Sequence, residues 1–131
     1  MTTTKIKLLT PTDRTEEGPR LTYDRDRLTL EYDYQQDDGS LEWRKIVFGE
    51  VLAVEYRQGI CCTADSIIGA REIRVSTNST WLAEVLEPWQ HAVGWHEWQE
   101  EQGGAARFRH FTVYFDDAAC IDVISSSCNV E

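Results

Sequence analysis

The fold of this chain follows from one stretch, Leu28-Thr29-Leu30-Glu31-Tyr32-Asp33-Tyr34, in which apolar or aromatic residues alternate with polar ones. Successive side chains of a strand point to opposite faces of a sheet, so the alternation predicts a half-buried strand. The turn Asp37-Asp38-Gly39-Ser40 comes next, and Asp-Gly supplies the positive φ that a tight hairpin needs. Residues 41–48 then return as the second strand, and Gly49 ends it.

Strand patterns continue along the rest of the chain. Residues 51–57 are β-branched and apolar enough for a central strand, and residues 72–77 alternate again. Residues 108–130 form a predicted hairpin, with Asp116 and Asp117 at its turn and residues 120–124 as its returning strand. These segments add up to an antiparallel meander of about six to seven strands.

One stretch has a helical pattern. Asn78, Ser79 or Thr80 can cap its N-terminus, and Pro88 kinks or restarts it because proline removes a backbone hydrogen bond. At about 100° per residue, one face holds the predicted core stripe of the helix. That stripe consists of Trp81, Leu82, Val85, Leu86, Trp89, Ala92, Val93 and His96.

The predicted fold class is therefore α+β, with one main helix packed on one face of the sheet before the C-terminal hairpin. The length of 131 residues fits one domain. Residues 1–18 are rich in Thr, Glu and Pro and are predicted to be a flexible polar leader, with a short strand around Ile6–Leu9 inside it. Residues 19–131 are predicted to form the single domain.

The chain is acidic, with a formal net charge of -10 and a pI near 4.7. Such a surface repels phosphate backbones and anionic lipid, so we expect neither nucleic-acid nor membrane binding. The charge is uneven: residues 1–74 hold 14 acids and 11 bases, whereas residues 75–131 hold 9 acids and 2 bases. This field would attract a basic partner protein, although an acid excess also serves solubility alone.

Four cysteines are present: Cys61, Cys62, Cys120 and Cys128. The N-terminal residues have no apolar segment of signal-peptide length, and no run of apolar residues is long enough for a membrane span. We therefore expect a cytoplasmic protein whose thiols are free.

The sequence contains no recognised catalytic or cofactor-binding motif. Cysteine and histidine spacings do not match those of zinc sites, so we expect no metal site and no cofactor. A Ser-His-Asp arrangement lacks the Gly-x-Ser-x-Gly elbow, and phosphate-binding glycine loops are missing too. No catalytic residue is assigned, and an enzyme remains an alternative interpretation, since catalytic groups meet in space rather than in sequence.

The tryptophans give the most specific prediction of a site. On a continued helix, Trp95 and Trp98 lie off the core stripe, and large aromatic side chains there are candidate anchors for a partner. If the helix breaks at Pro88 or Gly94 instead, both rings rotate into the core. The predicted partner-binding residues are Trp95, Trp98, His91, Glu84, Glu87, Glu97, Glu100, Glu101, Asp116 and Asp117.

These features favour a non-catalytic interaction module that binds a basic protein, such as an immunity or antitoxin-like inhibitor of a toxin. One alternative is a small enzyme or ligand-binding domain with a pocket between sheet and helix. Its lining would be Tyr32, Tyr34, Trp43 and Tyr114. A second alternative is a homo-oligomeric structural subunit paired through an exposed strand edge.

Overall fold

The structure is a computed structural model, and it describes residues 3–58, 71–91, 103–115 and 119–131. These residues form nine strands in two antiparallel sheets and one short α-helix, which confirms the predicted α+β class. The helix is α1 (Thr80–Leu86), followed by a 3-10 helix (Glu87–His91), and a second 3-10 helix (Gly104–Arg107) precedes β7. The strands are β1 (Thr3–Lys7), β2 (Arg20–Asp24), β3 (Arg27–Gln35), β4 (Leu41–Gly49), β5 (Ala53–Gln58), β6 (Glu72–Ser76), β7 (Arg109–Phe115), β8 (Ala119–Ser125) and β9 (Ser127–Val130).

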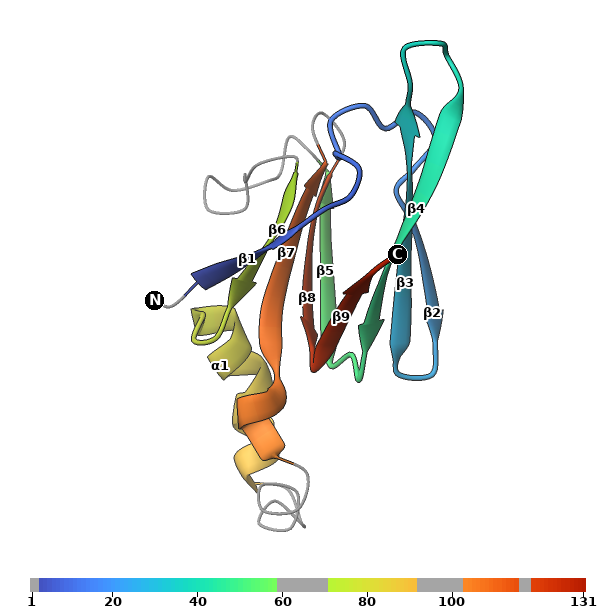
Figure 1. The fold of residues 1–131 in the computed structure, drawn as a ribbon. Helices are drawn as coiled ribbons and strands as arrows, with labels where there is room; N and C mark the ends of the chain where they lie inside the picture. The colour runs from blue at the N-terminus through green and yellow to red at the C-terminus, as the bar shows by residue number, and fades with distance from the viewer. Residues whose placement is uncertain (1–2, 59–70, 92–102, 116–118) are drawn as a thin grey trace.

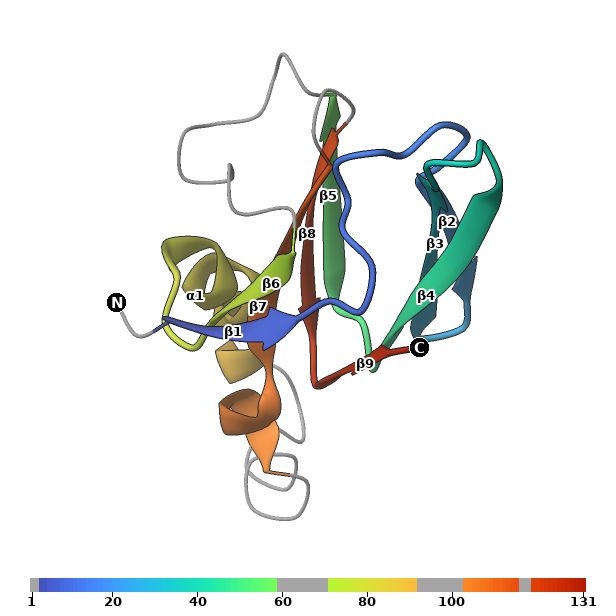
Figure 2. The ribbon, with the colours of Figure 1, turned by 45° about the horizontal axis from the view of Figure 1, so that its top comes forward.

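The molecule has three layers, which Figures 1 and 2 show from two directions. A five-stranded sheet in the order β1-β6-β7-β8-β5 lies between α1 and a four-stranded sheet in the order β2-β3-β4-β9. The chain passes between the sheets three times, at residues 8–19, at residues 50–52 and at Ser126. The single predicted meander is therefore divided between two facing sheets.

The space between the sheets holds the main core. Leu30, Tyr32, Ile46 and Phe48 from the four-stranded sheet are fully buried there. They face the apolar side chains of β7 and β8, and the Phe48 and Phe111 ring centroids lie 5.6 Å apart. The alternation that predicted the β3–β4 hairpin also selects this inward face, since Leu28 pairs with Phe48 and Leu30 with Ile46.

The predicted leader differs from the structure. Residues 3–7 form β1, which pairs with β6 along its whole length, and Leu8 is buried in the main core. Thr10 and Thr12 are buried as well, at 4% and 0% exposure. Polar composition suggested a free segment, but the Thr12 hydroxyl donates to a backbone carbonyl of β7 and so is satisfied inside the fold.

The position of β5 corrects a second expectation. This strand was predicted to be central, but it lies at one edge of the five-stranded sheet, paired only with β8 among the described strands. Val54 and Tyr56 consequently remain 38% and 44% exposed. A run of β-branched residues indicates that a segment forms a strand, but it does not indicate whether that strand lies at the centre or at the edge of its sheet.

Helix α1 covers part of the outer face of the five-stranded sheet. Ser79 is its N-cap, and the Ser79 hydroxyl oxygen accepts a hydrogen bond from the Leu82 N–H at 3.1 Å. Leu82 and Leu86 pack with Phe108 and Ile124 in a second, smaller core. This anchors the helix to the sheet.

The predicted core stripe is only partly correct. Leu82 and Leu86 are buried, but Trp81 is half-buried and Trp89 is 40% exposed. The α-helical turn ends at Leu86, and the 3-10 turn that follows advances about 120° per residue instead of about 100°. Residues three apart nearly eclipse each other in a 3-10 helix, so Trp89 still points close to the direction of Leu86. Its exposure therefore means that the rest of the fold covers this turn only in part. Ala92, Val93 and His96 lie outside the described residues.

No helix in the described residues combines the length and the apolar character needed to cross a membrane. The cysteines differ from the expectation of free thiols. Cys120 is disulfide-bonded, whereas Cys128 is free, and burial raises the Cys128 pKa to about 12. Cys61 and Cys62 lie outside the described residues.

Candidate functional site

Three of the ten predicted partner-binding residues lie in the described parts of the chain. They are Glu84 on α1 and Glu87 and His91 in the 3-10 helix that continues it, and all three are exposed. The other seven, for which the structure describes no position, are Trp95, Trp98, Glu97, Glu100, Glu101, Asp116 and Asp117.

The structure adds an exposed indole to these three residues. Trp89 lies in the same 3-10 helix as Glu87 and His91, and 40% of it is exposed. His91 Nε2 is 3.1 Å from Glu87 Oε1, one helical turn away, so this pair fixes one end of the surface. We call Glu84, Glu87, Trp89 and His91 the α1 surface.

The helical segment that carries the α1 surface is anchored to the five-stranded sheet. Its helix begins at a side-chain cap, buries Leu82 and Leu86 against the sheet, and ends in a turn that contains Pro88. Proline fixes its own φ and so restricts the backbone next to Trp89. An exposed aromatic side chain on an anchored element loses little conformational entropy when it binds a partner.

The structure does not bring the four residues of the predicted ligand pocket together. Tyr32 is buried between the sheets, and its ring meets Phe115 edge-on at 5.6 Å. Trp43 is on the opposite, outer face of the four-stranded sheet, under the Arg20 guanidinium at 4.5 Å. Tyr114 alternates with the core residues of β7 and so points to the α1 side of the other sheet. Tyr34 is half-buried with Arg14 over its ring.

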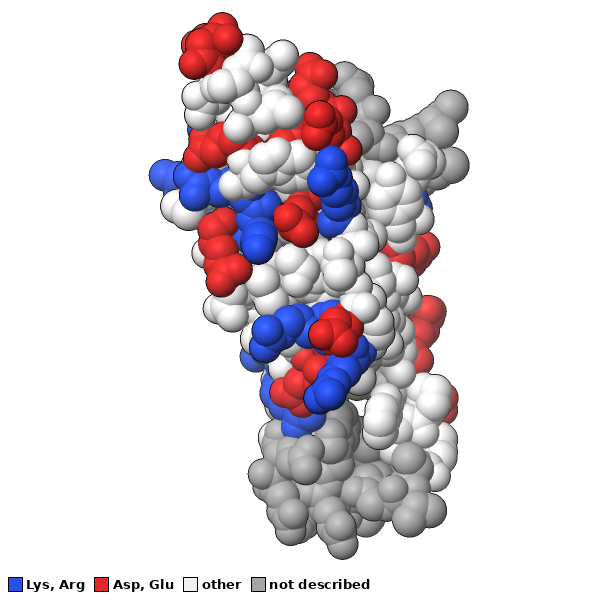
Figure 3. Space-filling model, turned by 90° about the vertical axis from the view of Figure 1, so that its right-hand side faces the viewer, with Lys and Arg blue, Asp and Glu red and all other residues white. Residues whose placement is uncertain are grey.

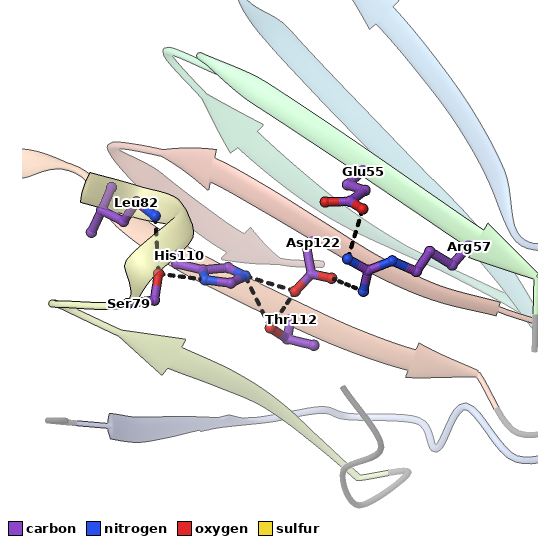
Figure 4. A network of polar contacts seen from close by, with 7 residues as sticks. All are labelled: Glu55, Arg57, Ser79, Leu82, His110, Thr112 and Asp122. Carbon is purple, nitrogen blue, oxygen red and sulfur yellow. Dashed lines mark hydrogen bonds and ion pairs between the residues drawn. The ribbon is translucent and has the colours of Figure 1, made fainter. Parts of the chain in front are cut away.

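A chain of polar side chains crosses the outer face of the five-stranded sheet, as Figure 4 shows. Ser79 Oγ lies 2.7 Å from His110 Nδ1, and His110 Nε2 lies 2.6 Å from Asp122 Oδ1. Thr112 Oγ1 donates to the same carboxylate oxygen at 2.7 Å. Arg57 then links Asp122 Oδ2, at 3.7 Å, to Glu55 at 2.6 Å.

The arrangement explains how these charges are tolerated. Glu55 and Asp122 are register partners on adjacent strands, where like charges repel, and Arg57 bridges them. Burial raises the pKa of Asp122, but the hydrogen bonds from His110 and Thr112 lower it more, so the net shift is downward. The carboxylate is thus ionised, and it holds a proton on His110 Nε2.

Ser79, His110 and Asp122 have the residue types of a hydrolytic triad. The Ser79 hydroxyl, however, is occupied by both the Leu82 N–H and the His110 ring, and Ser79 is only 7% exposed. The edge of the Trp81 ring packs against the His110 ring, with the centroids 5.0 Å apart. These contacts join the start of α1 to the sheet, so we assign the network a positioning role.

The described residues line at least two hollows. One, of about 300 Å3, lies between α1 and the second 3-10 helix and is lined mainly by apolar atoms of Leu82, Leu86 and neighbouring residues, with Ser79 at its rim. The other, of about 390 Å3, lies on the outer face of the four-stranded sheet among long side chains of both charge signs, such as Lys45 and Glu131. Neither is lined by the four residues of the predicted ligand pocket.

Sequence reasoning missed the polar network, and the sequence signals only part of it. Strand alternation puts His110 and Thr112 on the same face of β7. A two-residue turn at residues 116–117, however, would pair Thr112 with Ile121, whereas the structure pairs Thr112 with Asp122. The contribution of Ser79 could not be predicted either, because it depends on where α1 docks.

No protein-family model, curated protein or solved structure matches this chain.

Proposed function

We propose that this protein is a non-catalytic interaction module that binds a basic partner protein through the α1 surface. The observation that carries the proposal is the exposure of Trp89 on the same helical segment as the exposed acids Glu84 and Glu87, a segment anchored to the core through Leu82 and Leu86. A concrete form is an immunity or antitoxin-like inhibitor that covers the active site of a basic toxin.

The chemistry of the α1 surface fits such a role. Tryptophan is enriched among the residues that dominate binding energy at interfaces, because it buries a large apolar area with few rotatable bonds. Acids on the same helical segment accelerate the approach of a positively charged partner and disfavour acidic proteins. The net charge of -10 extends this effect over a longer range.

The distribution of charge along the chain supports a basic partner. Figure 3 shows the side of the molecule that lies at the right in Figure 1, where acidic and basic side chains are intermixed in two clusters with uncharged residues between them. The excess of acids therefore does not gather on that side. Residues 75–131, which include the α1 surface, carry 9 of the 23 acids but only 2 of the 13 bases.

The experiment is quantitative capture of partners by the tagged full chain from extracts of its native cell, with identification by mass spectrometry. We expect Trp89→Ala to weaken the principal captured partner by at least about 2 kcal/mol, or roughly 30-fold. Tyr56→Ala is the matched control, because Tyr56 is a similarly exposed aromatic residue on β5. Equal loss in both variants would contradict the proposal.

A charge test accompanies it. Glu84→Lys combined with Glu87→Lys should weaken capture strongly and reduce the salt dependence of the binding that remains. The control is Asp13→Lys combined with Glu16→Lys, which makes the same change of charge at two exposed acids in the N-terminal segment. If the control loses capture equally, the net charge and not the α1 surface is responsible.

A second candidate, a hydrolase, is favoured by the Ser79–His110–Asp122 geometry beside an apolar hollow. A fluorophosphonate reagent distinguishes the two, because it labels an activated serine hydroxyl. Our proposal predicts no labelling of Ser79. Labelling that disappears in Ser79→Ala would favour the hydrolase instead.

The cytoplasmic location predicted from the sequence belongs to this proposal, and Cys120 provides its test. Disulfides are rare in reducing compartments, so a cytoplasmic protein would carry Cys120 as a thiol in the cell. Rapid alkylation of cell extracts followed by mass spectrometry determines whether Cys120 is a thiol or part of a disulfide in the cell. A Cys120 disulfide that is present before lysis would count against a cytoplasmic location.

A further inference from the structure

Strand β2 is an edge strand whose five residues are all exposed. It pairs with β3 on one side, and among the described residues no strand pairs with its other side. Leu21 and Tyr23 remain 37% and 59% exposed although they lie on the same face as the core residues Leu30 and Leu28 opposite them. An exposed edge with apolar side chains favours pairing with another strand.

The register of the β2–β3 hairpin shows which backbone groups are available. Asp24 pairs with Arg27 across a two-residue turn, so these two residues exchange hydrogen bonds. Hydrogen-bonded and non-hydrogen-bonded pairs alternate in an antiparallel ladder. The N–H and C=O groups of Arg20, Thr22 and Asp24 therefore point toward β3, and those of Leu21 and Tyr23 point outward.

We propose that β2 pairs with β2 of a second copy of this chain, antiparallel and centred on Thr22, to join the two four-stranded sheets. In this register Leu21 lies opposite Tyr23 of the second copy, and the outward backbone groups of these two residues bond to each other. Thr22 lies opposite itself on the two-fold axis, which is the symmetry that a closed dimer requires.

The charges complement each other in the same register. Arg20 lies opposite Asp24 of the second copy, and the symmetry repeats the pair at the other end of the strand. Opposite charges, an aromatic–aliphatic pair and a Thr–Thr pair are all favourable cross-strand neighbours. Centring the pair on Leu21 instead would place Tyr23 opposite Pro19, which has no N–H to donate.

The two edges of the five-stranded sheet, β1 and β5, fit a second copy less well. Self-pairing of β1 around Lys5 would oppose like charges at its centre. Side chains along β5 alternate between exposed and half-buried, whereas every side chain of β2 is exposed. The joined strands are short, so the dimer is a weak one that forms at high protein concentration.

The test is the mass of the full chain by sedimentation equilibrium over a concentration series. The wild type should rise from 15.1 kDa to about twice that value at millimolar concentration. Thr22→Lys should stay monomeric, because it opposes two ammonium groups on the axis. Thr3→Lys is the control, since it alters an exposed threonine of β1, an edge of the other sheet, and should dimerise like the wild type.

A charge exchange tests the register itself. Arg20→Asp and Asp24→Arg should each prevent dimerisation by opposing like charges, and the double variant should restore it. Thermal unfolding confirms that every variant is folded. A wild type that stays at 15.1 kDa would overturn the proposal. A dimer that Thr22→Lys leaves unchanged would do so too, as would one that is lost only in Tyr56→Lys, a variant of the edge strand β5. The α1 surface is not involved, so Trp89→Ala should leave the dimer unchanged.

Discussion

Tyr32 and Asp33 are neighbours in β3, and their side chains hold the N-terminal segment from opposite faces of the sheet. The Tyr32 hydroxyl donates to the Thr10 carbonyl at 2.6 Å, and burial raises the Tyr32 pKa to about 12. The Asp33 carboxylate accepts from the backbone N–H groups of Glu16, Glu17 and Gly18. A Cβ atom on Gly18 would lie 3.1 Å from the Tyr32 Cα, so this close approach favours glycine.

Removing the Tyr32 hydroxyl tests whether residues 8–12 are part of the folded unit. Tyr32→Phe should lower the free energy of unfolding by about 1–2 kcal/mol, because the Thr10 carbonyl loses its partner in a buried place. Urea unfolding measures the change. Tyr23→Phe, at a tyrosine that is 59% exposed, is the control and should change it by less than about 0.5 kcal/mol. Equal effects would mean that the segment is not docked.

Asp33 makes stability depend on pH. Burial raises its pKa, but the hydrogen bonds from Gly18, Glu17 and Glu16 lower it more, so the net pKa lies below 3.8. A pKa that is lower in the folded state stabilises above the unfolded value, and this contribution is lost as the pH falls through the folded value. Unfolding measured from pH 7 to pH 2 should therefore show a loss of stability below about pH 4.

The matched variant is Asp33→Asn, which has no charge to titrate. It should be less stable at pH 7, and the difference from the wild type should shrink as the pH falls below 3.8. A difference that stays constant over this range would show that the carboxylate is not held by those backbone groups. Asp122, whose pKa is also lowered, titrates in the same direction and remains in both proteins.

At the scale of elements, α1 depends on one cap. Ser79 accepts the Leu82 N–H and contacts the His110 ring, so its hydroxyl joins the helix to β7. Ser79→Ala should cost about 1–2 kcal/mol of unfolding free energy. Thr80→Ala, at an exposed position in the first turn, is the control and should be close to neutral. Thermal unfolding of the two variants compares them, and equal midpoints would contradict the role of the cap.

The two hairpins could be predicted because their signals are local. Alternation from Leu28 to Tyr34 determines which face of β3 is buried, and Gly39 has the positive φ expected of the turn. The N-cap was narrowed to three residues, one of which is Ser79. The exposure of Trp89 was not predicted, because a helical pattern gives the face on which a residue lies and does not give how much of that face the rest of the fold covers.

At the scale of the whole molecule, the order of the strands could not be predicted. β1 pairs with β6, β4 with β9 and β5 with β8 across long sequence separations. The sequence of a strand does not identify the strand with which it pairs. The N-terminal threonines were taken for a free leader because their burial depends on carbonyl and hydroxyl groups supplied by both sheets. Of the four residues of the proposed α1 surface, the sequence prediction named Glu84, Glu87 and His91, whereas it assigned Trp89 to the core.

The most direct test of the α1 surface is hydrogen–deuterium exchange of the full chain with and without its captured partner. Binding through this surface should slow the exchange of backbone amides in residues 84–91 and leave the β3–β4 hairpin unchanged. Protection over β2, or over the hollow beside Ser79 with residues 84–91 unaffected, would contradict it.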